Sequence, residues 1–183
     1  MSRGTKTTGF LKECMADALI KLMRTKPIDK ISVQEITDLA GVGRATWFRN
    51  YSSKNEALTF KLICLWNRWA EDHGFADLGK YTVNLASEFF HFSYSVRELY
   101  DIIYSAELQF AIYDAFYQIM QPQFEASVKE FYQIRFYSYG LFGLLDEWIR
   151  RDYKESPEEM TRLFRNVFPV RKKPELDGVL QPK

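Results

Sequence analysis

The chain has 183 residues, of which 46% are hydrophobic and 27% are charged, a composition that excludes a disordered protein. Its two cysteines, Cys14 and Cys64, are too few for a disulfide framework, which favours a reducing compartment. The longest apolar run, near residues 141–145, is far too short to span a bilayer, and residues 1–10 lack the apolar stretch of a signal peptide. We therefore expect a cytoplasmic protein that stays off the membrane.

The net charge of +1 is unevenly distributed along the chain. Residues 1–54 contain ten lysines and arginines against five aspartates and glutamates, whereas the remainder contains 15 basic and 19 acidic residues. This asymmetry indicates a basic N-terminal region suited to an anionic partner, although a solvated basic helix face is the plainer explanation.

Helical spacing of apolar residues recurs along the whole chain, and no segment alternates like a strand. The sequence therefore predicts an all-α protein of about nine helices. We expect helices over residues 8–24, 32–40, 43–51, 54–72, 82–94, 96–105, 107–120 and 124–151, and a last one after residue 156. Four Ser-x-x-Glu capping boxes favour helix starts at Ser32, Ser53, Ser95 and Ser156.

Residues 32–54 contain the sharpest pattern, two short helices joined at Gly41, which can adopt the positive φ that ends the first helix. Val42 can fill the corner between them. This arrangement predicts a helix-turn-helix, the unit that presents its second helix to the DNA major groove. The small core that joins the two helices is expected to contain Ile36, Leu39, Trp47 and Tyr51.

The side chains of the second helix suit contact with DNA. Arg44 lies at its N-terminal end, where a forked guanidinium can bind O6 and N7 of a guanine. Ala45 and Thr46 are small enough for close approach, and either could touch a thymine methyl group. The expected phosphate donors are Ser32, Thr46, Arg49, Asn50 and Lys54.

Residues 8–72 resemble the DNA-binding domain of the TetR family of regulators, on the pattern Gly-Val-Gly-Arg-Ala-Thr-Trp-Phe-Arg-Asn-Tyr followed by Ser-Ser-Lys-Asn-Glu-Ala-Leu. The resemblance implies a homodimer on a palindromic double-stranded DNA operator. It places Gln34 and Arg44 at base-contacting positions and Lys54 at a phosphate-contacting one. Two residues depart from the family pattern, Phe48 in place of a usual tyrosine and Thr37 in place of a usual alanine.

The expected domains are a helix-turn-helix head over residues 1–54, a linking helix over 54–72, and an effector-binding and dimerisation domain over 73–183. Residues 75–183 contain 23 aromatic residues, most of which we expect in a helix-bundle core. Some are candidates for a cavity that binds a small organic effector, namely Phe90, Tyr94, Tyr104, Phe110, Tyr113, Tyr117 and Tyr137.

Residues 131–150, together with the Ser-Pro-Glu-Glu-Met that starts at Ser156, resemble the C-terminal domain of the DhaS-like subgroup of TetR regulators. That resemblance implies a partner protein as an alternative effector. Glycines let another helix approach closely, so we expect a four-helix-bundle dimer interface here, although tight packing within one subunit would use the same residues. The expected interface residues are Gly140, Gly143, Leu144 and Trp148.

The sequence gives no support for an enzyme, a metal site or a cofactor. His73 and His91 have no cysteine or histidine at ligand spacing, and the sequence has neither a nucleophile motif nor a glycine-rich phosphate loop. Glu71 and Asp72 could join the two histidines around a metal, but a solvated helix end is the simpler interpretation. The expected function is a DNA-binding transcription regulator, a repressor by preference. A helical protein-interaction module that has lost operator binding is the alternative, and Phe48 is its best support.

Overall fold

The structure is a computed structural model that describes residues 3–74, 83–121 and 127–167. Over these residues the prediction of an all-α protein of about nine helices is confirmed, with one additional 3-10 turn. The elements are α1 (Arg3–Met23), η1 (Ile28–Lys30), α2 (Val33–Ala40), α3 (Arg44–Asn50), α4 (Lys54–Asp72), α5 (Val83–Ser95), α6 (Arg97–Ser105), α7 (Phe110–Ile119), α8 (Val128–Arg150) and α9 (Pro157–Val167).

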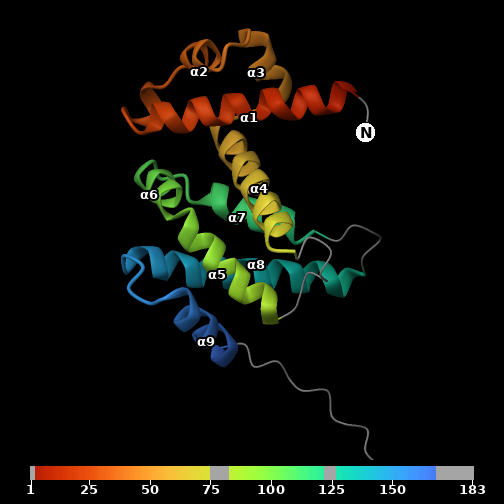
Figure 1. The fold of residues 1–183 in the computed structure, drawn as a ribbon, viewed down its shortest axis with the longest axis vertical. Coiled ribbons are helices and arrows are strands. Elements are labelled where there is room, and N and C mark those ends of the chain that lie inside the picture. Colours follow the sequence, from red (N-terminus) through yellow and green to blue (C-terminus); the bar gives the residue numbers. More distant parts are fainter. Residues whose placement is uncertain (1–2, 75–82, 122–126, 168–183) are drawn as a thin grey trace, which may run out of the picture.

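The helices form two groups that α4 connects (Figure 1). Helices α1, α2 and α3 form one end of the molecule, here called the head, with α2 and α3 on the outer side of α1. Helices α5 to α9 form the other end, here called the body, and α6 lies beneath the C-terminal end of α1. No helix within the described ranges is both long enough and apolar enough to cross a membrane.

Serine–glutamate pairs begin several of these helices, but not all the predicted ones. Ser32 and Glu35 form a complete capping box on α2, and Ser156 and Glu159 exchange the same two bonds on α9. At α4 the box is only half formed, because Ser53 accepts the Glu56 amide while the Glu56 carboxylate binds Ser52.

The predicted helix start at Ser95 is wrong. Helix α5 continues through Ser95, whose hydroxyl donates to the carbonyl of Phe92 at 2.6 Å, and α6 begins after Val96 without a side-chain cap. A start that sequence reasoning missed lies at Ser127, which forms a full capping box with Glu130 on α8. The Ser-x-x-Glu pattern therefore marks a helix start only where the preceding chain has left its own helix.

Helix α4 is held by α1 on one side and by α7 on the other. Lys61 of α4 is buried, and its ammonium group lies 2.7 Å from a Glu13 oxygen and 2.6 Å from an Asp17 oxygen of α1. On another side of α4, the Thr59 hydroxyl donates to the carbonyl of Ala111 in α7 at 3.2 Å. These polar contacts flank an apolar core that runs without a break from head to body, and its members include Met15, Leu19, Leu58, Leu62, Trp66, Phe90, Tyr100 and Trp148.

Candidate nucleic-acid interface

The turn between α2 and α3 depends on Gly41, which has a φ of +68°. The Gly41 amide donates to the carbonyl of Asp38 at 3.2 Å and the Val42 amide donates to the carbonyl of Thr37 at 2.9 Å, the bond pattern of a left-handed helix end. A Cβ at Gly41 would meet no atom within 4 Å, so the backbone conformation, and not space, calls for glycine here.

The core of the helix-turn-helix contains three of its four predicted residues. Ile36, Trp47 and Tyr51 are at most 2% exposed, and the Tyr51 hydroxyl donates to the carbonyl of Lys12 in α1 at 2.8 Å. Leu39 is 45% exposed, so its predicted place in the core is wrong. The buried face of α2 is centred on Ile36 and Thr37, and Leu39 falls at the edge of that face.

Thr37, the departure from the usual alanine, is fully buried, and its hydroxyl lies 3.0 Å from the carbonyls of Val33 and Gln34. Because the hydroxyl is satisfied within its own helix, the substitution leaves no unpaired polar group between α1 and α2.

Helix α3 presents four exposed side chains, Arg44, Ala45, Phe48 and Arg49, here called the reading surface. The guanidinium carbon of Arg44 lies 5.4 Å from the centre of the Phe48 ring, within the range of a cation–π contact. Among the described residues, neither arginine of the reading surface forms an ion pair with an acidic side chain. Their charge is therefore available to an anionic partner outside the protein.

The predicted phosphate donors differ in how they are engaged. Asn50 and Thr46 are half-buried, and the Asn50 amide donates to the Thr46 carbonyl at 2.7 Å. Ser32 is exposed but serves as the cap of α2, and the Lys54 ammonium donates to the carbonyl of Ile28 at 2.6 Å. Lys54 thus bridges the first turn of α4 to η1, a contact that the sequence pattern did not predict.

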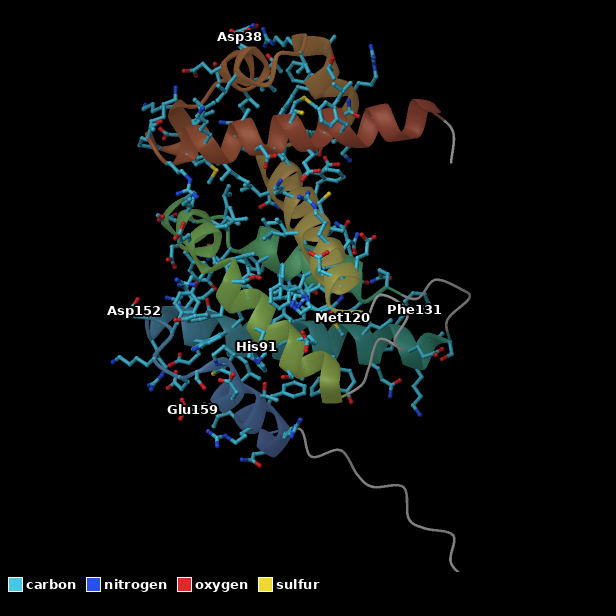
Figure 2. The ribbon with its side chains drawn as sticks, in the orientation of Figure 1. Asp38, His91, Met120, Phe131, Asp152 and Glu159 are labelled. Carbon is cyan, nitrogen blue, oxygen red and sulfur yellow. The ribbon has the colours of Figure 1, made fainter. Side chains whose placement is uncertain are left out.

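Gln34, predicted to contact bases, donates from its side-chain amide to Asp38 at 2.7 Å. Figure 2 places Asp38 at the outer end of the head, at the opposite end of the molecule from Glu159. Both Gln34 and Asp38 are exposed, so α2 adds an uncharged amide and one carboxylate to the surface of the head.

The Glu35 carboxylate is engaged by an ion pair and by hydrogen bonds. It pairs with Lys26 and accepts bonds from the amide and the hydroxyl of Ser32 at 2.8 and 2.9 Å. The hydrogen bond from Lys26, followed by those from Ser32, lowers the Glu35 pKa from 4.5 to about 2. The carboxylate therefore stays ionised at neutral pH and fixes the N-terminus of α2.

The seven residues predicted to line an effector cavity fall into separate groups. Phe90 is fully buried and Tyr94 is half-exposed, and their ring centres lie 5.8 and 6.0 Å from that of Trp148. The Tyr104 hydroxyl donates to Asp146 at 2.7 Å. A second aromatic group joins α7 to α8 and contains Phe110, Tyr113, Tyr117, Tyr139 and Phe142. Tyr137 is 37% exposed on α8, and its ring lies edge-to-face with that of Phe136.

Arg135 organises the second aromatic group and was not singled out from the sequence. It donates to the Tyr113 hydroxyl at 2.5 Å, and its guanidinium carbon lies 3.7 Å from the centre of the Tyr117 ring. The signal that could have found it is a lone arginine inside the aromatic run of residues 131–139, four residues from Tyr139 on the same helix.

The four predicted dimer residues on α8 differ in their exposure. Trp148 is 1% exposed, and its indole nitrogen donates to the carbonyl of Glu155 at 3.0 Å, so its predicted place in a dimer interface is wrong. Leu144 is half-buried against the core and Gly140 is half-buried. Gly143 is exposed, and a Cβ there would meet nothing within 4 Å.

Exposed aromatic side chains accompany Gly143 along α8. Tyr132 is 75% exposed, Phe136 64% and Tyr139 52%, and with Gly143 they follow a three- and four-residue spacing. This spacing puts them on one side of the helix, here called the α8 stripe. Phe131 lies near the same end of α8 (Figure 2) but on another side of the helix.

The two histidines occupy unrelated positions. His73 stacks on Trp69 at the end of α4, with ring centres 3.9 Å apart, whereas His91 of α5 lies 3.5 Å from a Glu158 oxygen of α9. The cluster of both histidines with Glu71 and Asp72 that the sequence left open is therefore not assembled, and the described residues contain no group of three potential metal ligands.

A comparison with protein families adds to this geometry. Residues 84–169, which contain helices α5 to α9 from near the start of α5, match the TetR family that is described as a transcriptional regulator C-terminal region. No curated protein matches the chain with significance. The DhaS-like subgroup stays a prediction. Preceded by a helix-turn-helix, this C-terminal region supports the assignment of the chain to the TetR family of transcriptional regulators.

Proposed function

We propose that the chain is a cytoplasmic, homodimeric repressor that binds a palindromic DNA operator and is released by an effector, either a small organic molecule or a partner protein. The observation that carries this proposal is the reading surface. Its two arginines are exposed at the outer end of the head and have no acidic partner among the described residues. An exposed helix with unpaired arginines and small neighbours suits the major groove.

Individual contacts follow from this arrangement. Arg44, steadied by the Phe48 ring, is proposed to bind a guanine, and Ala45 leaves room for a thymine methyl group. Arg49 is proposed to bind phosphate. The side chains of Ser32, Asn50, Gln34 and Lys54 form intramolecular hydrogen bonds, so we propose that they share or exchange these bonds when DNA binds. Thr46 is proposed to bind phosphate through its hydroxyl.

A dimer is supported by the α8 stripe. Three aromatic side chains that are more than half exposed, beside a glycine with open space above it, would be covered if α8 of a second copy packed against them. We propose this face as the centre of the two-fold interface, with the two heads then facing successive major grooves about 34 Å apart.

Helix α4 supports a coupling between body and head. Its first turns contact α1 through Lys61 and α7 through Asn55 and Thr59, so a displacement of α7 is transmitted to Lys54 and to α1. We propose that the effector changes the position of α4 and thereby the separation of the two heads, which lowers operator affinity. The proposed division of the chain is a head over residues 1–54, a linking helix over 54–72 and a regulatory domain over 73–183.

The experiment is selection of bound sequences from a random duplex library by the full-length protein at two salt concentrations. We expect an enriched palindrome whose affinity falls steeply with salt, because arginine–phosphate contacts release counterions. Arg44→Ala should cost about 1–3 kcal/mol and relax the preference at one base pair in each half-site, whereas Arg49→Ala should weaken all sequences alike.

Absence of an enriched sequence would refute operator reading. It would favour the protein-interaction module, for which the exposed aromatic stripe on α8 would then be the contact surface.

A further inference from the structure

A cleft of about 400 Å³ lies where the head meets the body. The head contributes the end of α1 and the turn before η1, and the body contributes the last turn of α6, which lies beneath α1 in Figure 1. None of the aromatic residues predicted to bind an effector lines it. The lining residues are Met23, Lys26, Pro27, Ile28, Asp29, Ile102, Ser105, Ala106 and Glu107. The volume is within the range of small-molecule sites.

The lining combines apolar side chains with an excess of negative charge. Lys26 is the one basic lining residue, and the Glu35 carboxylate neutralises it from outside the cleft. The Asp29 carboxylate of the head forms an ion pair with the exposed Lys30, whose ammonium nitrogen lies 3.4 Å from an Asp29 oxygen. Glu107 of the body forms neither a side-chain hydrogen bond nor an ion pair among the described residues. The cleft therefore offers one uncompensated carboxylate beside apolar side chains.

Glu107 adopts a backbone conformation that is unfavourable for a residue with a side chain. Its φ is +57°, and the bonds from its amide to the Tyr104 carbonyl and from the Leu108 amide to the Ile103 carbonyl form the left-handed helix end at which glycine is favoured. Tyr153, another residue with positive φ, is explained by ring packing on Trp148. The Glu107 side chain has no such packing role within the described part of the chain.

The cleft wall is directly connected to two predicted DNA contacts. The Ile28 carbonyl accepts the bond from Lys54, and Lys26 pairs with the glutamate that caps α2 beside Ser32. A molecule bound between Ile28 and α6 would therefore contact Ile28, which holds Lys54, and Lys26, which pairs with the capping glutamate of α2. It would do so without entering the core of the body.

We propose that this cleft binds a small organic cation, a protonated amine on an apolar body, whose charge pairs with Glu107 and Asp29. The bound cation spans head and body and shifts η1 relative to α6, and operator affinity falls. The proposed loss of operator affinity rests on the proposed function, whereas the binding of the cation does not.

The test uses three probes of similar size on the full-length protein: 2-phenylethylammonium, the neutral 2-phenylethanol and the anionic 3-phenylpropanoate. Calorimetry without DNA should show the cation bound about fivefold more tightly than the alcohol, with the carboxylate weakest. Glu107→Gln should bring cation and alcohol to nearly equal affinity. Asp152→Asn removes an acid with a φ of +58° outside the cleft and should leave the difference unchanged.

A second pair of variants separates binding from folding. Glu107→Gly and Asp152→Gly both relieve a left-handed backbone, so both should raise the melting temperature, but only the first should abolish the cation preference. Equal binding of the three probes to the native protein, or an unchanged preference in both Glu107 variants, would overturn the inference. Cation binding in a protein that selects no DNA sequence would support the site and refute the proposed function instead.

Discussion

Phe48 stands on the reading surface, 61% exposed, with the Arg44 guanidinium over its ring. A cation–π contact at an exposed site contributes roughly 0.5–1 kcal/mol, enough to bias Arg44 toward one orientation before DNA arrives. The residue that departs from the family pattern, and that supported loss of DNA binding, thus has a positive role available to it. Phe48 lacks the hydroxyl that a tyrosine could offer to phosphate, but it keeps the ring that orients Arg44.

Phe48→Leu should lower operator affinity about two- to fivefold and relax the preference at the base pair read by Arg44, because the ring beneath the guanidinium is lost. Phe48→Tyr keeps the ring and adds a donor for phosphate, so affinity should stay equal or rise, with the salt dependence unchanged because no charge is added. Titration of labelled operator at two salt concentrations measures both. Phe110→Leu, at an exposed ring on α7, is the control that should change nothing.

Single residues also show where sequence reasoning stops. Ile36, Trp47 and Tyr51 are predictable as core because their spacing places them on one face of two short helices. The environments of Leu39 and Trp148 could not be predicted in this way. Periodicity shows on which face of a helix an apolar side chain lies, but not which neighbouring element covers that face. Leu39 is exposed, whereas Trp148 is covered by α5 and by the chain after α8.

Helix α2 is held at its N-terminus by one carboxylate. The Glu35 pKa of about 2 in the folded protein lies below its usual 4.5, because Lys26 and Ser32 donate to the ionised form. A lowered pKa means that the contribution to stability is complete above pH 4.5 and declines as the pH falls toward 2. We therefore expect the melting temperature of Glu35→Gln to lie below that of the native protein at pH 6. The difference between the two melting temperatures should become smaller as the pH falls from 6 to 3.

Glu130→Gln is the matched control for Glu35, since Glu130 forms the same capping box on α8 with Ser127. Its pKa is lowered by Ser127 alone among its hydrogen-bond donors, without a lysine in contact. The pH-dependent difference in melting temperature should therefore be smaller for Glu130→Gln. If the difference between Glu35→Gln and the native protein stayed constant from pH 6 to pH 3, the carboxylate charge would not stabilise α2.

At the level of helices, much of the fold could be predicted from the sequence, because the signals that begin and end a helix lie close to it in the chain. Helix α4 begins and ends at the predicted residues because Ser53 caps it and the chain turns at Gly74, whose φ is +72°. The cleft between η1 and α6 could not be predicted, because it joins residues 23–29 to residues 102–107 and no periodicity encodes that approach. The dispersal of the aromatic candidates has the same origin, since their contacts join α5 to α8 and α7 to α8.

On the scale of the whole molecule, head and body share one apolar core through α4, so neither can tilt without moving that helix. The buried Lys61 strengthens the constraint, because two carboxylates of α1 neutralise it and separation would leave a charge in an apolar setting. A head that is rigidly attached to its body reads two half-sites only if the bodies are themselves fixed relative to each other. Under the proposed function, operator binding and dimerisation are therefore linked.

This linkage gives the last prediction. Phe136 lies in the middle of the α8 stripe and is 64% exposed, so Phe136→Glu places a charge at the centre of the proposed interface without disturbing the core of one subunit. We expect sedimentation to show a monomer with unchanged helix content and melting behaviour that no longer depends on concentration. Operator affinity should fall by more than about a hundredfold, because a monomer binds one half-site. Phe131→Glu is the control, since Phe131 lies roughly 140° away around the same helix and should leave the dimer intact. If Phe136→Glu remained dimeric and bound the operator normally, the interface would lie elsewhere and the α8 stripe would be a surface for another protein.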